Sequence, residues 1–536
     1  MKTNDNYHPE ERTSGSTISY WMDSVAPITF TKLTENIETE IAIIGGGISG
    51  LTTAYFLCKE NKKVVLIEDG NIGSGESGRT TAHITNSFDD GYAEIEKVFD
   101  EKTSRLVADS HTAAIKMIEN IVRDENIDCD LEKVSGYLFL DPSDEMESLR
   151  EEFEAAQRAR VAVNWHTETP LIKNIQSPCI EFEDQAQFHI MKYLKGLTDA
   201  IVRMGGKIFT STHAKEISET ENNCLILTSD GNKIQCEKVI VATNSPVNDL
   251  FTMHTKQAAY RSYVIGAQIQ KGALPHALWW DTGDQNSKWQ SMPYHYVRLQ
   301  SYNEEHDILI CGGEDHKTGQ QDEEKERYPD EETAAEDRFK KLEEWIRSHF
   351  PQIEKFIYRW SGQVMEPVDF LAYIGLNPGN KNIYIVTGDS GNGMTHGTIA
   401  GMLIPDLITG RENPWKEIYD PSRKPPVKTI KEFLVEGGNV IKQTIDVITG
   451  GDIKSPEELD PGHGAILSSG LKKIAIYKDT DKNIHSFSAF CPHLKCVVKW
   501  NDTEKTFDCP CHGSRFTALG KVINGPAISD LEKVKL

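Results

Sequence analysis

The sequence lacks several features that would assign it to whole classes of protein. Its first 40 residues hold no apolar run flanked by basic residues, the pattern of a secretory signal peptide. Positive charge is scarce: 58 Lys and Arg face 82 Asp and Glu, and the net charge of −24 disfavours nucleic acid or an anionic membrane as a partner. Internal repeats and low-complexity segments are also missing. We therefore expect a cytoplasmic globular protein.

Uninterrupted apolar runs long enough to cross a membrane are missing as well. One uncharged run covers residues 41–58, but glycines and hydroxyl side chains interrupt it. Six of the ten cysteines are scattered, which is typical of small buried residues in a reducing compartment. The other four lie between residues 491 and 511, and this grouping indicates a dedicated site.

The chain of 536 residues is long for a single core and suggests two or three domains. Residues 1–36 are polar, and we expect them to be irregular or loosely docked. Residues 37–425 carry strand–helix–strand patterns, helical periodicity at 95–122, a hairpin with an Asp230-Gly231 turn, and a β-rich part at 258–312 that predicts several antiparallel strands. A linker helix is expected at 426–454, and residues 455–536 have the short strands and turns of a small all-β domain.

Near the N-terminus, Gly45, Gly47 and Gly50 form G-x-G-x-x-G between the apolar strand "IAII" and a predicted helix. Such glycines let the backbone approach a pyrophosphate at the helix N-terminus. Glu68 ends the next strand, where its carboxylate can accept a hydrogen bond from a ribose hydroxyl. The pattern predicts a dinucleotide site; the alternative is a glycine-rich structural turn.

Three more segments favour FAD over NAD: "GSGESGRTTAHIT" (73–85), the late strand ending "VIVATN" (239–244), and the glycine turn 388–393 before another helix. The motifs "IIGGGISGLTTAYFL", "SGRTTAH" and "GDSGNGMTHGTIAG" resemble those of the FAD-dependent D-amino-acid oxidase and glycine oxidase superfamily. The resemblance covers about residues 38–410. It implies an α/β Rossmann-like FAD domain, an antiparallel-sheet (α+β) substrate domain, and oxidation of a C–N bond by hydride transfer to FAD.

On this resemblance the FAD-binding residues are predicted to be Gly45, Gly46, Gly47, Ile48, Ser49, Gly50, Glu68, Asp69, Ser77, Gly78, Arg79, Thr80, Thr81, Ala242, Thr243, Gly391, Gly393, Met394 and Thr395. Some relatives attach FAD covalently through a histidine near this region, which makes His83 a candidate. The other interpretation is that His83 is an ordinary neighbour of the flavin.

The C-terminal group "CPHLKC…CPCHGS" places Cys491-x-His493 and Cys509-x-x-His512 in two loops. This is the ligand pattern of a Rieske [2Fe–2S] cluster, in which two thiolates bind one iron and two imidazoles bind the other. The alternative is tetrahedral zinc, for which the spacing is unusual.

The neighbouring residues resemble those of Rieske proteins from cytochrome bc-type complexes. That resemblance implies a disulfide between Cys496 and Cys511, and a hydrogen bond from Ser514 to a cluster sulfide. The sequence departs from the pattern at two positions. Lys495 stands where glycine is common. Phe516 stands where high-potential relatives have tyrosine, and this second change should lower the reduction potential.

The whole chain resembles bacterial amine- or amino-acid-oxidase-like FAD proteins with a C-terminal Rieske domain. We therefore predict a dehydrogenase acting on a small amine or amino acid, which passes electrons singly through the cluster to an external redox protein or quinone. The alternative is a non-catalytic carrier or a reductase in which the cluster feeds the flavin. A Rieske non-haem iron oxygenase is disfavoured, because only 24 residues follow His512 and such enzymes place an iron domain there.

Substrate contacts are predicted from strand parity. Tyr294, Tyr296 and Arg298 would share one face of a strand, where Tyr and Arg suit a carboxylate. The alternative is a cross-strand ladder with a structural arginine. His316 and Lys317 form a second candidate pair.

Overall fold

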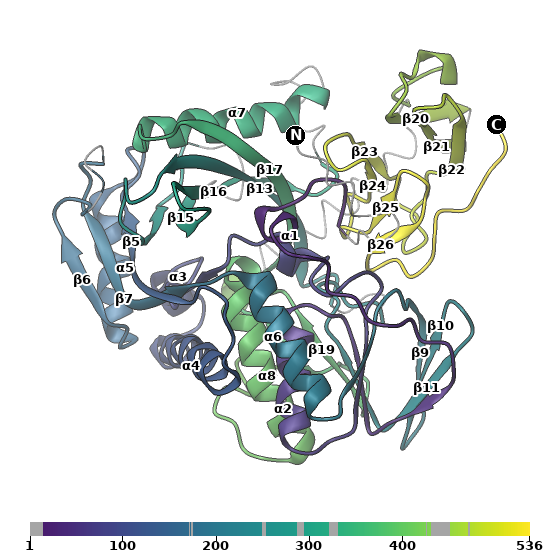
Figure 1. Cartoon of the computed structure of the whole chain (residues 1–536), viewed down its shortest axis with the longest axis horizontal. Coiled ribbons are helices and arrows are strands. Elements are labelled where there is room, and N and C mark those ends of the chain that lie inside the picture. The colour runs from purple at the N-terminus through teal and green to yellow at the C-terminus, as the bar shows by residue number, and fades with distance from the viewer. Residues whose placement is uncertain are drawn as a thin grey trace.

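The computed structural model describes residues 14–170, 172, 175–248, 253–286, 294–320, 331–424, 426–429, 451–469 and 472–536. Most of the expected linker helix at 426–454 therefore lies outside the described residues. Figure 1 shows two large units and a smaller all-β domain, drawn in yellow, beside the N-terminal segment. In the described part of the chain, no helix is long and apolar enough to span a membrane.

The first unit is built on a six-stranded sheet. Its strands β2 and β3 are fully buried and apolar, because helices pack on one face of the sheet and a second, smaller sheet packs on the other. The predicted strand–turn–helix–strand unit at the N-terminus is confirmed. In sheet order the strands are β18 (Tyr373–Leu376), β19 (Ile383–Thr387), β12 (Lys238–Val241), β2 (Ile41–Ile44), β3 (Val64–Ile67) and β8 (Lys207–Phe209). All neighbours are parallel except β18 and β19.

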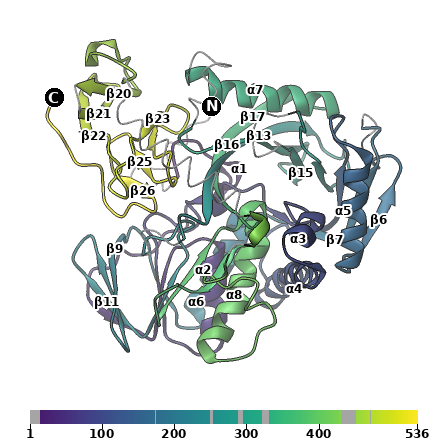
Figure 2. The same cartoon turned by 180° about the vertical axis from the view of Figure 1, so that it is seen from behind.

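Helices α2, α6 and α8 lie side by side in Figures 1 and 2 and share one hydrophobic core with this sheet. Glycines on α8 allow a close approach, since a Cβ on Gly401 would lie 2.4 Å from the Thr52 methyl of α2. The helices of this unit and its neighbourhood are α2 (Ile48–Lys59), α3 (Tyr92–Val98), α4 (Glu101–Glu125), α5 (Met146–Arg158), α6 (Ile190–Arg203) and α8 (Gly393–Thr409).

Two local predictions have different outcomes. The hairpin with an Asp230-Gly231 turn is confirmed by antiparallel β10 (Cys224–Thr228) and β11 (Lys233–Cys236), with Gly231 at a φ of 87°. They form a four-stranded sheet in the order β1-β11-β10-β9, with β1 (Ile37–Glu38) and β9 (Ala214–Glu219). The single helix expected at 95–122 is instead two helices. The first helix ends at Val98. The side chain of Asp100 then accepts a hydrogen bond from the Thr103 amide and caps the N-terminus of α4.

The second unit is a nine-stranded sheet covered on one side by α7 (Glu331–His349). The antiparallel strands expected at 258–312 are confirmed, with one difference: β14 pairs with β5 in parallel. The strand order is β17 (Lys355–Pro367), β13 (Gln257–Gln270), β16 (His306–Lys317), β15 (Tyr296–Ser301), β14 (Leu278–Asp281), β5 (Glu132–Phe139), β7 (Cys179–Gln187) and β4 (His83–Ile84), with β6 (Val163–His166) also on β7.

The C-terminal domain contains two small antiparallel sheets around its own core, as expected for a small all-β domain. One sheet is β20-β21-β22 and the other is β23-β24-β25-β26. Their bounds are β20 (His463–Ser469), β21 (Lys472–Lys478), β22 (Ile484–Ser488), β23 (Lys499–Asn501), β24 (Thr506–Asp508), β25 (Arg515–Thr517) and β26 (Val522–Asn524).

The described part of the N-terminal extension is largely irregular, as expected, but it is firmly packed and not loosely docked. Trp21 of α1 (Tyr20–Asp23) is fully buried and donates a hydrogen bond to the Thr80 carbonyl at 2.6 Å. Ser16 donates its amide to the Glu504 carbonyl in the C-terminal domain. The extension therefore lies between two domains and binds both, which a polar composition does not reveal.

Candidate functional site

The glycine turn has the geometry of a dinucleotide cradle. A Cβ on Gly45 would lie 2.2 Å from the Ala242 carbonyl oxygen, and one on Gly50 would lie 2.0 Å from the Gly45 oxygen. Only glycine fits this close approach of strand and helix. Glu68 accepts hydrogen bonds from the amides of Gly46 at 2.6 Å and Gly70 at 3.0 Å. Burial raises the pKa of Glu68 to about 7 despite these bonds.

The turn opens into a cavity of about 1030 Å³ that extends from the dinucleotide domain to the nine-stranded sheet. Most predicted FAD residues line it: Gly45, Gly47, Ile48, Ser49, Glu68, Asp69, Ser77, Arg79, Thr80, Thr81, Ala242, Thr243, Gly391, Gly393 and Met394. The remaining predicted residues do not line the cavity: Gly46, Gly50, Gly78 and Thr395. The cradle, the acceptor at Glu68 and the cavity fit FAD.

The end of the cavity at the nine-stranded sheet is where substrate is expected, and we refer to it as the substrate end. The residues found there agree only in part with the prediction from strand parity. Tyr294 and Tyr296 line the cavity, and the Tyr294 hydroxyl donates to Asp89. Arg298 does not line the cavity, contrary to the prediction that it contacts the substrate. Its Nη1 donates to three backbone carbonyls, of residues 81, 82 and 188, and its Nη2 donates to Gln300 at 2.6 Å. Its Nε is buried without a hydrogen-bond partner among the described residues, but the side chain does not reach the cavity, which favours the interpretation of Arg298 as a structural arginine.

The second candidate pair also lies away from the cavity. His316 is buried and stacks on Tyr263 with ring centroids 5.7 Å apart, and Lys317 lies over the Tyr260 ring. Neither side chain is part of the cavity wall.

His83 does line the cavity, and both its nitrogens are engaged. Its Nε2 donates to the Val297 carbonyl at 3.3 Å, so its Nδ1 accepts from the Thr81 hydroxyl at 3.0 Å. Burial, with the charge of Arg298, lowers the pKa of His83 to about 3 and keeps the ring neutral. These bonds favour the interpretation of His83 as an ordinary neighbour of the flavin.

Four acidic residues at the substrate end were not anticipated. Carboxylate oxygens of Asp89, Asp90 and Glu366 lie within 4.8 Å of one another, and Asp315 also lines the cavity. Burial, followed by repulsion between the acids, raises the pKa of Asp90 and Glu366 well above the usual range. They come from distant parts of the chain with no motif spacing, so no local signal identifies the group.

The four predicted cluster ligands come together in the C-terminal domain. The thiols of Cys491 and Cys509 are buried and within hydrogen-bonding reach, which lowers the pKa of Cys491 to about 7. The rings of His493 and His512 lie 5.0 Å apart, centroid to centroid. Nδ1 of His512 is buried without a hydrogen-bond partner, and burial lowers the pKa of this ring to about 3. Paired thiols beside paired imidazoles fit a Rieske cluster.

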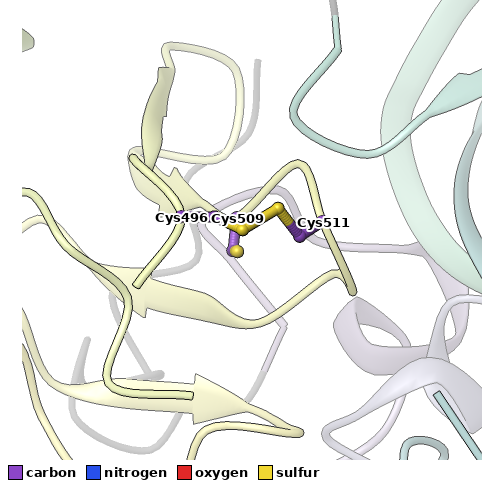
Figure 3. A group of neighbouring side chains, drawn as sticks. All are labelled: Cys496, Cys509 and Cys511. Carbon is purple, nitrogen blue, oxygen red and sulfur yellow. A yellow bond between two sulfur atoms is a disulfide. The ribbon is translucent and has the colours of Figure 1, made fainter. Parts of the chain in front are cut away.

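The two ligand loops are joined by the expected disulfide between Cys496 and Cys511, with the Cys509 sulfur beside it (Figure 3). Disulfide sulfurs are not available as thiolate ligands, so the three neighbouring cysteines do not form a separate metal site. Ser514 lies within hydrogen-bonding reach of Cys491. Lys495 adopts a φ of 61°, which explains why glycine suits that position.

The cluster loops are in contact with the flavin-binding unit. His254, which precedes β13, is buried with its ring 5.1 Å from that of His493 and 6.0 Å from that of His512. Gln363 of β17 lines the cavity and donates its side-chain amide to the Gly513 carbonyl at 3.1 Å. One side chain thus joins the cavity wall to the residue that follows a cluster ligand.

A buried carboxylate holds this contact together. Glu504 of the C-terminal domain accepts from the Thr17 hydroxyl at 2.6 Å and lies 3.4 Å from Arg79 and 3.5 Å from Arg261. Burial raises the pKa of Glu504, but Arg79, Arg261 and Arg515 outweigh it and lower the pKa to about 2. The Arg79 guanidinium, predicted to serve FAD, thus binds another domain.

Comparison with known families agrees with this division. Residues 40–407 match the family model of FAD dependent oxidoreductases, and residues 452–535 match that of the Rieske [2Fe-2S] domain. The Rieske 2Fe-2S iron-sulfur protein YhfW of Bacillus subtilis (strain 168) is 31% identical over 529 residues, covering 97% of both chains. These matches identify FAD and a [2Fe–2S] cluster as the cofactors.

Two further proteins are similar to the flavin-binding part. Gamma-glutamylputrescine oxidoreductase of Escherichia coli (strain K12) is 27% identical over 392 residues, which are 71% of this chain and 86% of that one. The crystal structure of glycine oxidase from Geobacillus kaustophilus covers 73% of this chain and 100% of its own, with a TM-score of 0.58 and 16% identity. The second likeness establishes the fold.

Proposed function

Since this chain belongs to the FAD dependent oxidoreductase family and carries a Rieske [2Fe–2S] domain, we propose that it is an amine dehydrogenase that relays electrons between its own two cofactors. FAD supplies a two-electron hydride acceptor, and the cluster supplies a one-electron carrier to an external redox protein or quinone. We propose the domain limits 37–425 and 455–536, and a cytoplasmic location.

One observation carries the proposal: the histidine edge of the cluster site is packed against the flavin-binding unit. His254 touches the rings of both ligand histidines, and Gln363 bonds to the backbone beside His512. A domain that exchanged electrons only with outside partners would have no need to bury these rings internally. The buried contact of Glu504 with Arg79 and Arg261 supports a fixed arrangement.

The lining of the cavity favours a cationic substrate over a free amino acid. Asp89, Asp90, Asp315 and Glu366 lie at the substrate end, whereas Arg298 is committed to backbone carbonyls. The only arginine and lysine among the described lining residues are Arg79, bound to Glu504, and Lys97, paired with Glu94 and Glu151.

A bound ammonium group would stabilise the ionised form of these acids and lower their raised pKa, whereas a bound carboxylate would favour their neutral form. A bound protonated amine would also offset the electrostatic repulsion between the acids. We therefore place the class of amines, including diamines, ahead of simple amino acids.

The test is anaerobic mixing of the purified holoprotein with a panel of mono-, di- and polyamines and amino acids. Flavin absorbance and the paramagnetic signal of the reduced cluster are followed together. If an amine bleaches the flavin and the cluster signal then rises, the proposal is supported. If only chemical reductants or a redox protein reduce the cluster first and the flavin second, the alternative of a reductase or carrier replaces it.

A further inference from the structure

The Rieske domain forms part of the wall of the dinucleotide cavity. The contributing residues are Val522, Ile523, Asn524, Gly525 and Ala527. They belong to β26 and the turn that follows it. This part of the wall is separated by more than 100 residues from the last part contributed by the flavin-binding unit, Met394. This wall of the cavity is therefore complete only when the two domains are docked.

Contacts from both domains fix the position of this turn. A Cβ on Gly525 would lie 3.0 Å from Val247 and 3.2 Å from the Ser245 carbonyl oxygen, so its backbone packs directly on the segment after β12. On the other side, Ala527 donates its amide to the Ser514 hydroxyl at 3.0 Å, next to the cluster. The turn thus lies between the cluster loop and the strand end that supplies Ala242 and Thr243.

The side-chain oxygen of Asn524 accepts no hydrogen bond from the described residues. Its Nδ2 lies 3.5 Å from a Glu76 carboxylate oxygen, which can only accept a hydrogen bond. The amide nitrogen therefore faces Glu76, and Oδ1 points elsewhere. Oδ1 is buried and has no hydrogen-bond partner within the part of the chain that the structure describes. A buried acceptor without a donor is destabilising unless a ligand supplies one.

We propose that Asn524 is a ligand of FAD contributed by the Rieske domain. Its Oδ1 accepts a hydrogen bond from a hydroxyl or amino group of the dinucleotide, both of which FAD carries. By linkage, FAD then binds more tightly when the domain is docked, and FAD stabilises the docking to the same extent. This inference requires FAD binding but does not depend on the direction of electron flow or on the substrate.

The proposal is tested with the full-length protein carrying Asn524→Ala. FAD is removed and added back, and the dissociation constant is measured from flavin fluorescence. Loss of one hydrogen bond should weaken FAD binding by about three- to tenfold. Lys521→Ala is the matched control, since Lys521 is exposed, lies three residues away and does not line the cavity. Equal affinities for the two variants would overturn the proposal.

The paramagnetic signal of the reduced cluster shows whether the variant folds. If Asn524→Ala loses that signal, the wild-type protein decides the question by hydrogen exchange. Adding FAD to the apoprotein should slow exchange at 522–527 and leave β22 unchanged, because β22 does not line the cavity. If the exchange at 522–527 does not respond to FAD, the Rieske domain contributes nothing to the site.

Discussion

The imidazole of His254 meets that of His493 at 77°, with ring centroids 5.1 Å apart. One histidine belongs to the flavin-binding unit and the other to the Rieske ligand set, so this is a contact between the two redox units. In Figure 2 the yellow domain again lies against the rest of the molecule, as it does in Figure 1.

Replacing His254 by Ala should uncouple the two cofactors. The substitution removes a ring packed on both ligand histidines and admits water beside the cluster. We expect flavin reduction by substrate to keep its rate and the following reduction of the cluster to slow several-fold. Stopped-flow absorbance with rapid-freeze spectroscopy separates the two steps. His306→Ala, a partly exposed hairpin residue of the same unit, is the control and should change neither.

Replacing Glu504 by Gln should weaken the docking of the Rieske domain. Removing one partner of a buried ion pair leaves Arg79 and Arg261 uncompensated and costs about 3–5 kcal/mol. Thermal unfolding followed through the cluster signal should show a lower midpoint. The exposed Glu532 gives the matched control Glu532→Gln, for which no shift is expected. An unchanged midpoint for Glu504→Gln would contradict the docking role.

The same carboxylate predicts acid sensitivity. Its pKa is about 2 in the folded protein and 4.5 in its unperturbed state. A lowered pKa gives stability that is fully present above pH 4.5 and is lost as the pH falls towards 2. We therefore expect the free energy of unfolding of the wild type, monitored by the cluster signal, to fall more steeply with decreasing pH over that window. The steepening should be smaller in Glu504→Gln, and equal slopes in both proteins would argue against this assignment.

Asp315 should govern the use of cationic substrates. Burial raises the pKa of Asp315 to about 7, so its charge appears as the pH rises through that value. We expect kcat/KM for an amine to rise over the same range, and Asp315→Asn to lower it roughly ten- to hundredfold and remove this limb. Glu305→Gln, at an exposed hairpin, should behave as wild type. A variant that keeps full activity with the amine would show that Asp315 does not bind the cationic group.

Removing the disulfide should affect the cluster but not the flavin. Cys496 and Cys511 join the two ligand loops across 15 residues, a closure worth about 3 kcal/mol. The double variant Cys496→Ala/Cys511→Ala should lose iron at a lower temperature, with its FAD content unchanged. Iron release and flavin content measured along one heating series provide the test. Equal iron retention would show that the loops need no covalent link.

The sequence by itself determined the local chemistry of this protein. Gly45 and Gly50 predict their own cradle, because the close approach of strand and helix excludes any side chain there. Cys491 and His512 likewise belong to short loops whose spacing fixes the ligand set. The uninterrupted apolar residues of β2 and β3 predict strands buried on both faces, which is typical of a parallel sheet.

Only the tertiary structure decided how these parts face one another. Strand parity placed Arg298 with the tyrosines, but parity cannot reveal that backbone carbonyls of distant residues occupy its guanidinium. The contacts of Glu504 with Arg79 and of His254 with His493 join residues hundreds of positions apart. No local spacing encodes such pairs, because their partners are set by the docking of whole domains, and the coupling between the two cofactors depends on that docking.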